Sequence, residues 1–296
     1  MLYLILAIST APIITVAFRL SNKYIKNKMM MFFVNYLSCS ICALFFLNNL
    51  SEYSNEELTF PIWFGIVMGI FFLITFLFYE FNIRKNGIIL SNIFSKLGKI
   101  VPVIITLIMF NEVPTRLKII GIILSIIAVI IMNIEFKRKE DPSNDCLEED
   151  NEENERRGVN ASFIFLIIFL LLSGITDSST TIFKHMSVKE LNGFFLLFVF
   201  GSAMFLSLII LIIKHQKIGL SDIIFGLIIG IPNYFSSFFT LKALESIPAQ
   251  VVYPSYCVGS ILIITIIGVI AFKEKLKIKD YIGILIIIAA LILLNI

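Results

Sequence analysis

The chain has 296 residues, of which 58% are hydrophobic and only 15% are charged. A soluble domain of this length is roughly half apolar and about a quarter charged, so the composition excludes an ordinary soluble protein. The net charge of +3 comes from short runs between apolar stretches, without a basic arm carrying aromatic residues, and we expect no nucleic-acid partner. This composition fits a lipid bilayer as solvent and predicts an all-α integral membrane protein.

Apolar stretches long enough to cross a bilayer recur along the whole chain. A spanning helix needs about 20 mostly apolar residues, because lipid cannot satisfy backbone hydrogen bonds. The first stretch lacks the basic segment that precedes the apolar part of a signal peptide, so we interpret it as a span. About ten transmembrane helices are predicted, near residues 2–20, 29–48, 61–82, 88–110, 117–136, 161–183, 191–213, 221–244, 249–272 and 278–296.

One long polar segment, residues 137–160, interrupts the series of apolar stretches. It opens with three basic residues and continues with a run of acidic ones. High charge with little apolar content is typical of a disordered linker. The linker predicts two five-helix repeats, residues 1–136 and 161–296.

The two halves are related in sequence. A shift of 162 positions places residues 110–133 over 272–295, with nine of 24 positions identical. Because five is an odd number of spans, the second repeat must enter the membrane from the opposite side. Inverted repeats with a site at their interface are typical of secondary transporters, which open that site to each side in turn.

Loop charges predict the orientation in the membrane. On one side of the predicted spans the loops carry 17 Lys and Arg residues, and on the other side they carry 5. Cytoplasmic loops are the ones enriched in Lys and Arg, so this difference predicts that both termini lie outside.

In each of the repeated segments, an apolar residue, a variable position and a Glu are followed nine residues later by Gly, namely Glu112 with Gly121 and Glu274 with Gly283. This pattern resembles the drug/metabolite transporter superfamily, EamA type. The sequence LKALESIPAQVVYP at 241–254 is similar to the family's segment at the start of the ninth helix. The resemblance implies a ten-helix basket with a central cavity that transports metabolites or drugs. The first span has no acidic residue, unlike small multidrug relatives, which argues against proton-coupled cation export of that kind.

Two lysines lie inside the predicted fourth span. An ionisable residue at a helix centre costs about 2.5–3.5 kcal/mol, so each is a candidate functional residue. Lys96 and Lys99 are three residues apart, which places both on one helix face and favours an anionic substrate. Alternatively, Lys96 pairs with Glu80 or extends toward the membrane surface.

Asp177 is the most deeply placed acidic residue, in the predicted span 161–183. Burial would favour its protonated form, which suits an ion-coupling group, and pairing with Lys99 is an equal alternative. Glu80 is a second ion-coupling candidate.

Polar and aromatic residues in three spans complete the predicted substrate site: Asn92, Asn233, Tyr234 and Tyr256. Pro232 kinks the helix beside Asn233 and frees a backbone carbonyl. Tyr253 fits either this site or an aromatic belt at the membrane surface.

These features predict a secondary transporter, an exporter or exchanger, that moves a small organic metabolite across the plasma membrane by alternating access. The expected partners are the bilayer and the solute, and either a monomer or a homodimer fits. A non-transporting receptor or scaffold and an intramembrane enzyme are the alternatives. We expect no catalytic residue, metal or cofactor, because both histidines lie near water and no Gly-x-Ser-x-Gly or His-Glu-x-x-His sequence occurs.

Overall fold

The computed structural model describes residues 1–47, 53–86, 88–111, 113–133, 152–214, 218–272 and 278–295. These residues form helices and short connections, with no strand among them. Within this part of the chain, six helices are long and apolar enough to cross a bilayer, and the all-α membrane fold is confirmed. The helices are α1 (Leu2–Tyr24), α2 (Lys28–Phe45), α3 (Asn55–Asn86), α4 (Ile88–Gly98), α5 (Ile100–Met109), α6 (Arg116–Asn133), α7 (Glu152–Met186), the 3₁₀ turn η2 (Lys189–Leu191), α8 (Asn192–Lys214), α9 (Leu220–Leu244), α10 (Ala249–Phe272) and α11 (Ile278–Asn295).

The predicted fourth span, 88–110, is two helices rather than one. α4 ends at Gly98 and α5 begins at Ile100, with Lys99 between them. Pro102 has no N–H to donate to the carbonyl of Gly98, and the chain tightens instead through a bond from Lys99 N to Lys96 O of 3.2 Å. The break therefore lies beside the lysines that the sequence singled out.

The segment predicted as a disordered linker, 137–160, is helical from Glu152 onward, since α7 begins there. Glu and Arg are good helix formers, and acidic residues stabilise the first turn of a helix. Residues 137–151 lie outside the described residues.

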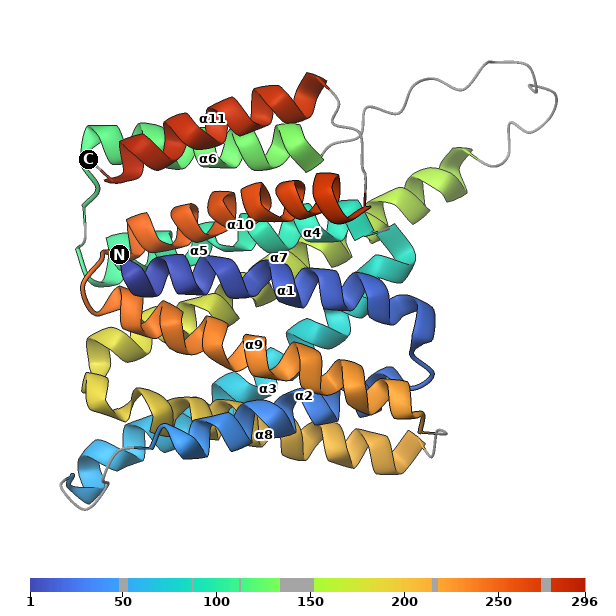
Figure 1. Ribbon diagram of the computed structural model, residues 1–296, viewed down its shortest axis with the longest axis vertical. Helices are drawn as coiled ribbons and strands as arrows, with labels where there is room; N and C mark the ends of the chain where they lie inside the picture. The colour runs from blue at the N-terminus through green and yellow to red at the C-terminus, as the bar shows by residue number, and fades with distance from the viewer. Residues whose placement is uncertain are drawn as a thin grey trace.

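The helices pack as layers, with α6 and α11 at one edge of the molecule and α2 and α8 at the other (Figure 1). Each helix of the first half has a counterpart at the same place in the second half, for example α1 and α7, or α3 and α9. Counterparts have equivalent packing partners in the opposite half. α1 packs on α9 as α7 packs on α3, and α2 packs on α9 as α8 packs on α3. α2 with α8, α5 with α10 and α6 with α11 are pairs of corresponding helices. The packing of the helices is therefore approximately two-fold symmetric between the halves.

Corresponding helices run in opposite directions along the bundle. α1 and α7, α2 and α8, and α6 and α11 are each antiparallel, and both termini lie at the same end (Figure 1). This is the geometry that an odd number of spans in each half requires.

Glycines spaced four residues apart allow the closest helix crossings in both halves. Cβ atoms on Gly226 and Gly230 of α9 would lie 2.6 Å from Val34 Cβ and Asn35 O of α2. Gly65 and Gly69 of α3 meet α8 in the same way, and a Cβ on Gly65 would lie 2.7 Å from Phe198 Cβ. Small residues at this spacing let helix backbones approach where lipid offers no hydrophobic driving force.

Large apolar side chains cover the outside of the bundle. Exposed examples are Ile108 on α5, Phe205 on α8 and Leu285 on α11. A water-facing surface would not carry such side chains in these numbers, so they form the surface that contacts lipid.

Asp222 holds the α1–α2 connection to the start of α9. Its carboxylate is fully buried and accepts from the backbone N–H groups of Lys26 at 2.8 Å, Asn27 at 3.2 Å and Gly219 at 2.8 Å. A carboxylate bonded to several N–H groups is a strong, charge-assisted contact.

Asp222→Ala is therefore expected to lower the free energy of unfolding by about 3 kcal/mol, because three backbone N–H groups, one buried and two partly buried, lose their acceptor. Thermal unfolding of the detergent-purified protein measures the loss. The control is Ser221→Ala, which removes one exposed bond to Tyr24 O at 2.9 Å and should cost about 0.5 kcal/mol. Equal effects of the two substitutions would contradict the prediction.

Candidate functional site

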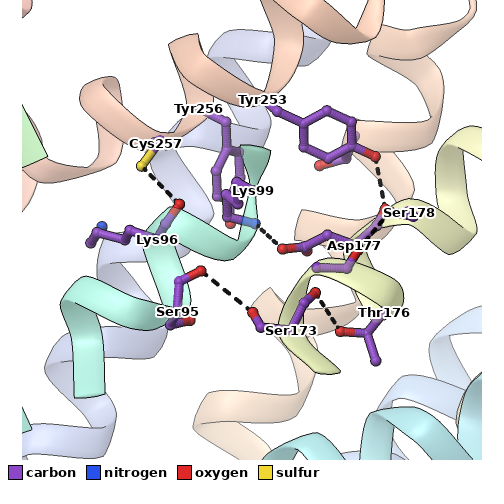
Figure 2. A network of polar contacts seen from close by, with 12 residues as sticks. Ser95, Lys96, Lys99, Ser173, Thr176, Asp177, Ser178, Tyr253, Tyr256 and Cys257 are labelled. Carbon is purple, nitrogen blue, oxygen red and sulfur yellow. Dashed lines mark hydrogen bonds and ion pairs between the residues drawn. The ribbon is translucent and has the colours of Figure 1, made fainter. Parts of the chain in front are cut away.

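Lys99 and Asp177 form an ion pair between the α4–α5 break and the middle of α7. Lys99 Nζ lies 3.0 Å from Asp177 Oδ2, and both side chains are mostly shielded. The ammonium also lies 4.6 Å from the centre of the Tyr256 ring of α10, which adds a cation–π contact. Figure 2 shows Lys99 directed at Asp177 beneath Tyr256. Helices from both halves of the chain thus meet at one pair of opposite charges.

A close crossing of α4 and α7 brings the pair together. A Cβ on Gly98 would lie 2.9 Å from Leu170 O, and one on Gly174 would lie 2.9 Å from Gly98 O and against the Val101 side chain. Gly98 directly precedes Lys99, and Gly174 precedes Asp177 by less than one turn. The two small residues therefore set the separation of the two charges.

Tyr253 ties α10 to the same part of α7. Its hydroxyl lies 2.8 Å from the carbonyl oxygen of Asp177, to which it donates, and 2.7 Å from each hydroxyl of Thr180 and Thr181. The Tyr256 hydroxyl lies 2.9 Å from Ser236 Oγ on α9. These contacts fix the tyrosines around the ion pair.

Lys96 has a different partner from Lys99. Its ammonium donates to Ser260 Oγ on α10 at 3.3 Å, and its carbonyl accepts from Cys257 Sγ at 3.8 Å. The sequence placed both lysines on one helix face, but their side chains point apart in Figure 2. The helix break at Lys99 changes the 3.6-residue geometry on which that expectation depended.

A small cavity of about 20 Å³ lies between α4, α5, α6 and α10, with room for little more than one water molecule. Lys96, Lys99, Ser125, Tyr253 and Cys257 line it together with apolar side chains. Within the described residues no group of His, Cys, Asp and Glu could hold a metal ion.

Asn233 and Tyr234 are not brought to the ion pair. Asn233 Nδ2 donates to Asn35 Oδ1 of α2 at 3.2 Å. Tyr234 is fully buried among aromatic rings that include Phe46 and Phe238. The side chains of the predicted site residues Glu80 and Asn92 lie outside the described residues, as do Glu112 and Glu274.

The sequence did not single out Ser260 or the Gly98–Gly174 crossing, and it left the place of Tyr253 undecided. Tyr253 precedes Tyr256 by three residues, so both lie on one face of α10. This spacing could have placed Tyr253 in the same site as Tyr256. Gly98 and Gly174 each lie close in sequence to an intramembrane charge, and this pattern could have indicated the close helix crossing.

Residues 164–296 match the EamA-like transporter family. The predicted resemblance to EamA-type transporters is confirmed. The match covers the second half of the chain, and the matched family consists of membrane transporters of small solutes. The apolar helices independently make this chain a multi-pass membrane protein.

Two further proteins are similar to this chain. A Haemophilus influenzae protein described as uncharacterized is 24% identical over 268 residues, which are 87% of this chain and 84% of that protein. A protein of known crystal structure is 11% identical, with a TM-score of 0.72 over 99% of this chain and 94% of that one. The second likeness shows a shared fold.

The Gly98–Gly174 crossing predicts opposite effects for two glycine substitutions. Gly174→Ala places a methyl group against Val101 and the Gly98 carbonyl, and should cost about 1–3 kcal/mol of stability. A Cβ on Gly201 of α8 meets nothing within 4 Å, so Gly201→Ala should stabilise by up to about 1 kcal/mol through helix propensity. Thermal unfolding in detergent gives both signs, and a neutral Gly174→Ala would show that the crossing is loose.

The ion pair predicts strong coupling between its two residues. Lys99→Met or Asp177→Asn alone leaves an uncompensated charge and should cost about 3–5 kcal/mol. The double variant should recover most of that loss, because neither charge remains. A double-mutant cycle from unfolding curves measures the coupling, and additive losses would mean that the two charges do not interact.

Proposed function

We propose that this protein is a secondary transporter that moves a small organic solute by alternating access. The observation that carries the proposal is the Lys99–Asp177 ion pair beneath Tyr256, at the meeting of helices from both halves of the chain. Charged groups at this depth are costly and mark solute or ion pathways in membrane proteins.

The arrangement of the helices supports alternating access between two inverted five-helix repeats. Corresponding helices are antiparallel, and their packing partners exchange between the halves (Figure 1). When two halves have the same fold in opposite orientation, exchanging their conformations moves the opening from one membrane face to the other. The small volume of the cavity beside the ion pair fits a closed stage of such a cycle.

The ion pair supplies the chemistry for an anionic solute. Lys99 would bind a carboxylate or similar group, which would replace Asp177 as the counter-ion of the ammonium. Tyr256 would contact the organic part of the solute, since its ring already lies over Lys99. Asp177 would then lose its ammonium partner, which makes it the ion-coupling candidate at this site.

Export or exchange across the plasma membrane is the direction and location that we propose. The match to a transporter family and the source of the Haemophilus influenzae relative fit a location in a bacterial plasma membrane.

The test is solute exchange in proteoliposomes that contain the purified full-length protein and a mixture of isotope-labelled organic acids. At least one acid should cross faster than in protein-free liposomes. Lys99→Gln in the Asp177→Asn background, which restores neutrality, should reduce that rate by about 10- to 100-fold through loss of a charge-assisted contact. Lys118→Gln near the start of α6 is the matched control and should leave the rate unchanged.

Two results would contradict the proposal in different ways. Absence of flux for every tested solute would favour a receptor or scaffold. An unchanged flux after the loss of Lys99 and Asp177 would support solute transport but would show that these two residues do not form the binding site.

A further inference from the structure

Lys96 is a cation at membrane depth without an acidic partner among the described side chains. Lys96 is half-buried, and its ammonium donates to the neutral hydroxyl of Ser260 at 3.3 Å. The nearby carboxylate, that of Asp177, bonds to Lys99. Removing a lone ammonium from water is costly unless an opposite charge accompanies it.

The surroundings of Lys96 leave room for such a charge. The small cavity that Lys96 and Lys99 line is bounded by α4, α5, α6 and α10, so residues from both halves of the chain enclose it. Its volume of about 20 Å³ suits a halide ion or a single carboxylate group and is too small for a larger organic solute. Ser125 of α6 lines the same cavity, and its hydroxyl bonds to Ile122 O of its own helix at 2.7 Å.

The charges of the described residues in this part of the bundle also do not cancel. Lys96 and Lys99 contribute two positive charges, and Asp177 offsets the second of them. A single bound monovalent anion would neutralise this part of the bundle.

We propose that Lys96 forms a second anion site beside the Lys99–Asp177 pair, which binds one small monovalent anion between α4, α5, α6 and α10. The anion is either a free halide or the carboxylate end of a solute, since both offer one negative charge in a small volume. Ser260 holds the ammonium in place, so that its remaining N–H groups are available to the anion.

The experiment compares thermal stability of the detergent-purified full-length protein in sodium gluconate, chloride, bromide and acetate at constant ionic strength. Gluconate is too bulky for the cavity and serves as the reference. A small anion that binds the folded state should raise Tm saturably, by about 2–4 °C at high occupancy. Lys96→Gln should abolish that rise, while Lys26→Gln at the exposed α1–α2 connection should preserve it.

The individual anions distinguish the two sources. A rise with chloride and bromide alone assigns the site to a free halide, and a rise with acetate as well assigns it to carboxylates. An unresponsive wild-type protein, or a Lys96→Gln variant that responds like wild type, would overturn the proposal.

A second variant covers the case in which Lys96→Gln does not fold. Ser125→Leu keeps the ammonium but fills the cavity from α6, and it loses only a bond within its own helix. It should therefore remove the response to small anions, and a retained response would place their binding elsewhere. Stability is measured here without flux, so failure of anion binding and failure of solute transport are separate results.

Discussion

The structure depends on one constraint, which is that a charge inside a bilayer must have a partner. Lys99 meets that constraint through Asp177 at 3.0 Å and through the ring of Tyr256. The pair is possible because Gly98 and Gly174 let α4 and α7 approach closely beside the two charges. Packing and electrostatics are therefore coupled at this point, since a larger residue at the crossing would separate charges that cannot turn to water instead.

The same packing device holds the rest of the bundle. Gly65 and Gly69 of α3 and Gly226 and Gly230 of α9 form equivalent close crossings, on α8 and α2 respectively. Without a hydrophobic driving force between helices in lipid, such contacts must supply much of the association energy. Their occurrence at corresponding places explains why the packing partners exchange between the two halves.

The centre of the molecule departs from this two-fold pattern in its charges. The first half supplies Lys96 and Lys99, and the second supplies Asp177 and the tyrosines of α10. α4 and α5 are separated at Lys99, whereas the corresponding α10 is continuous. The helix packing thus repeats in both halves, whereas the charged and aromatic residues of the site are divided between the halves. The proposed solute-binding role of the pair and the proposed anion site at Lys96 both rest on that division.

The sequence by itself determined the solvent, the apolar spans and the relation between the halves, because hydrophobicity and its period are properties of local stretches. It also identified Lys99, Asp177 and Tyr256, since an ionisable or polar residue inside a span is conspicuous without coordinates. Only the tertiary structure decided that Lys99 bonds to Asp177, that Lys96 turns to Ser260, and that Tyr234 packs among aromatic rings. Those outcomes depend on the break at Lys99 and on glycine crossings between helices far apart in the chain, and no local pattern specifies which helices will meet.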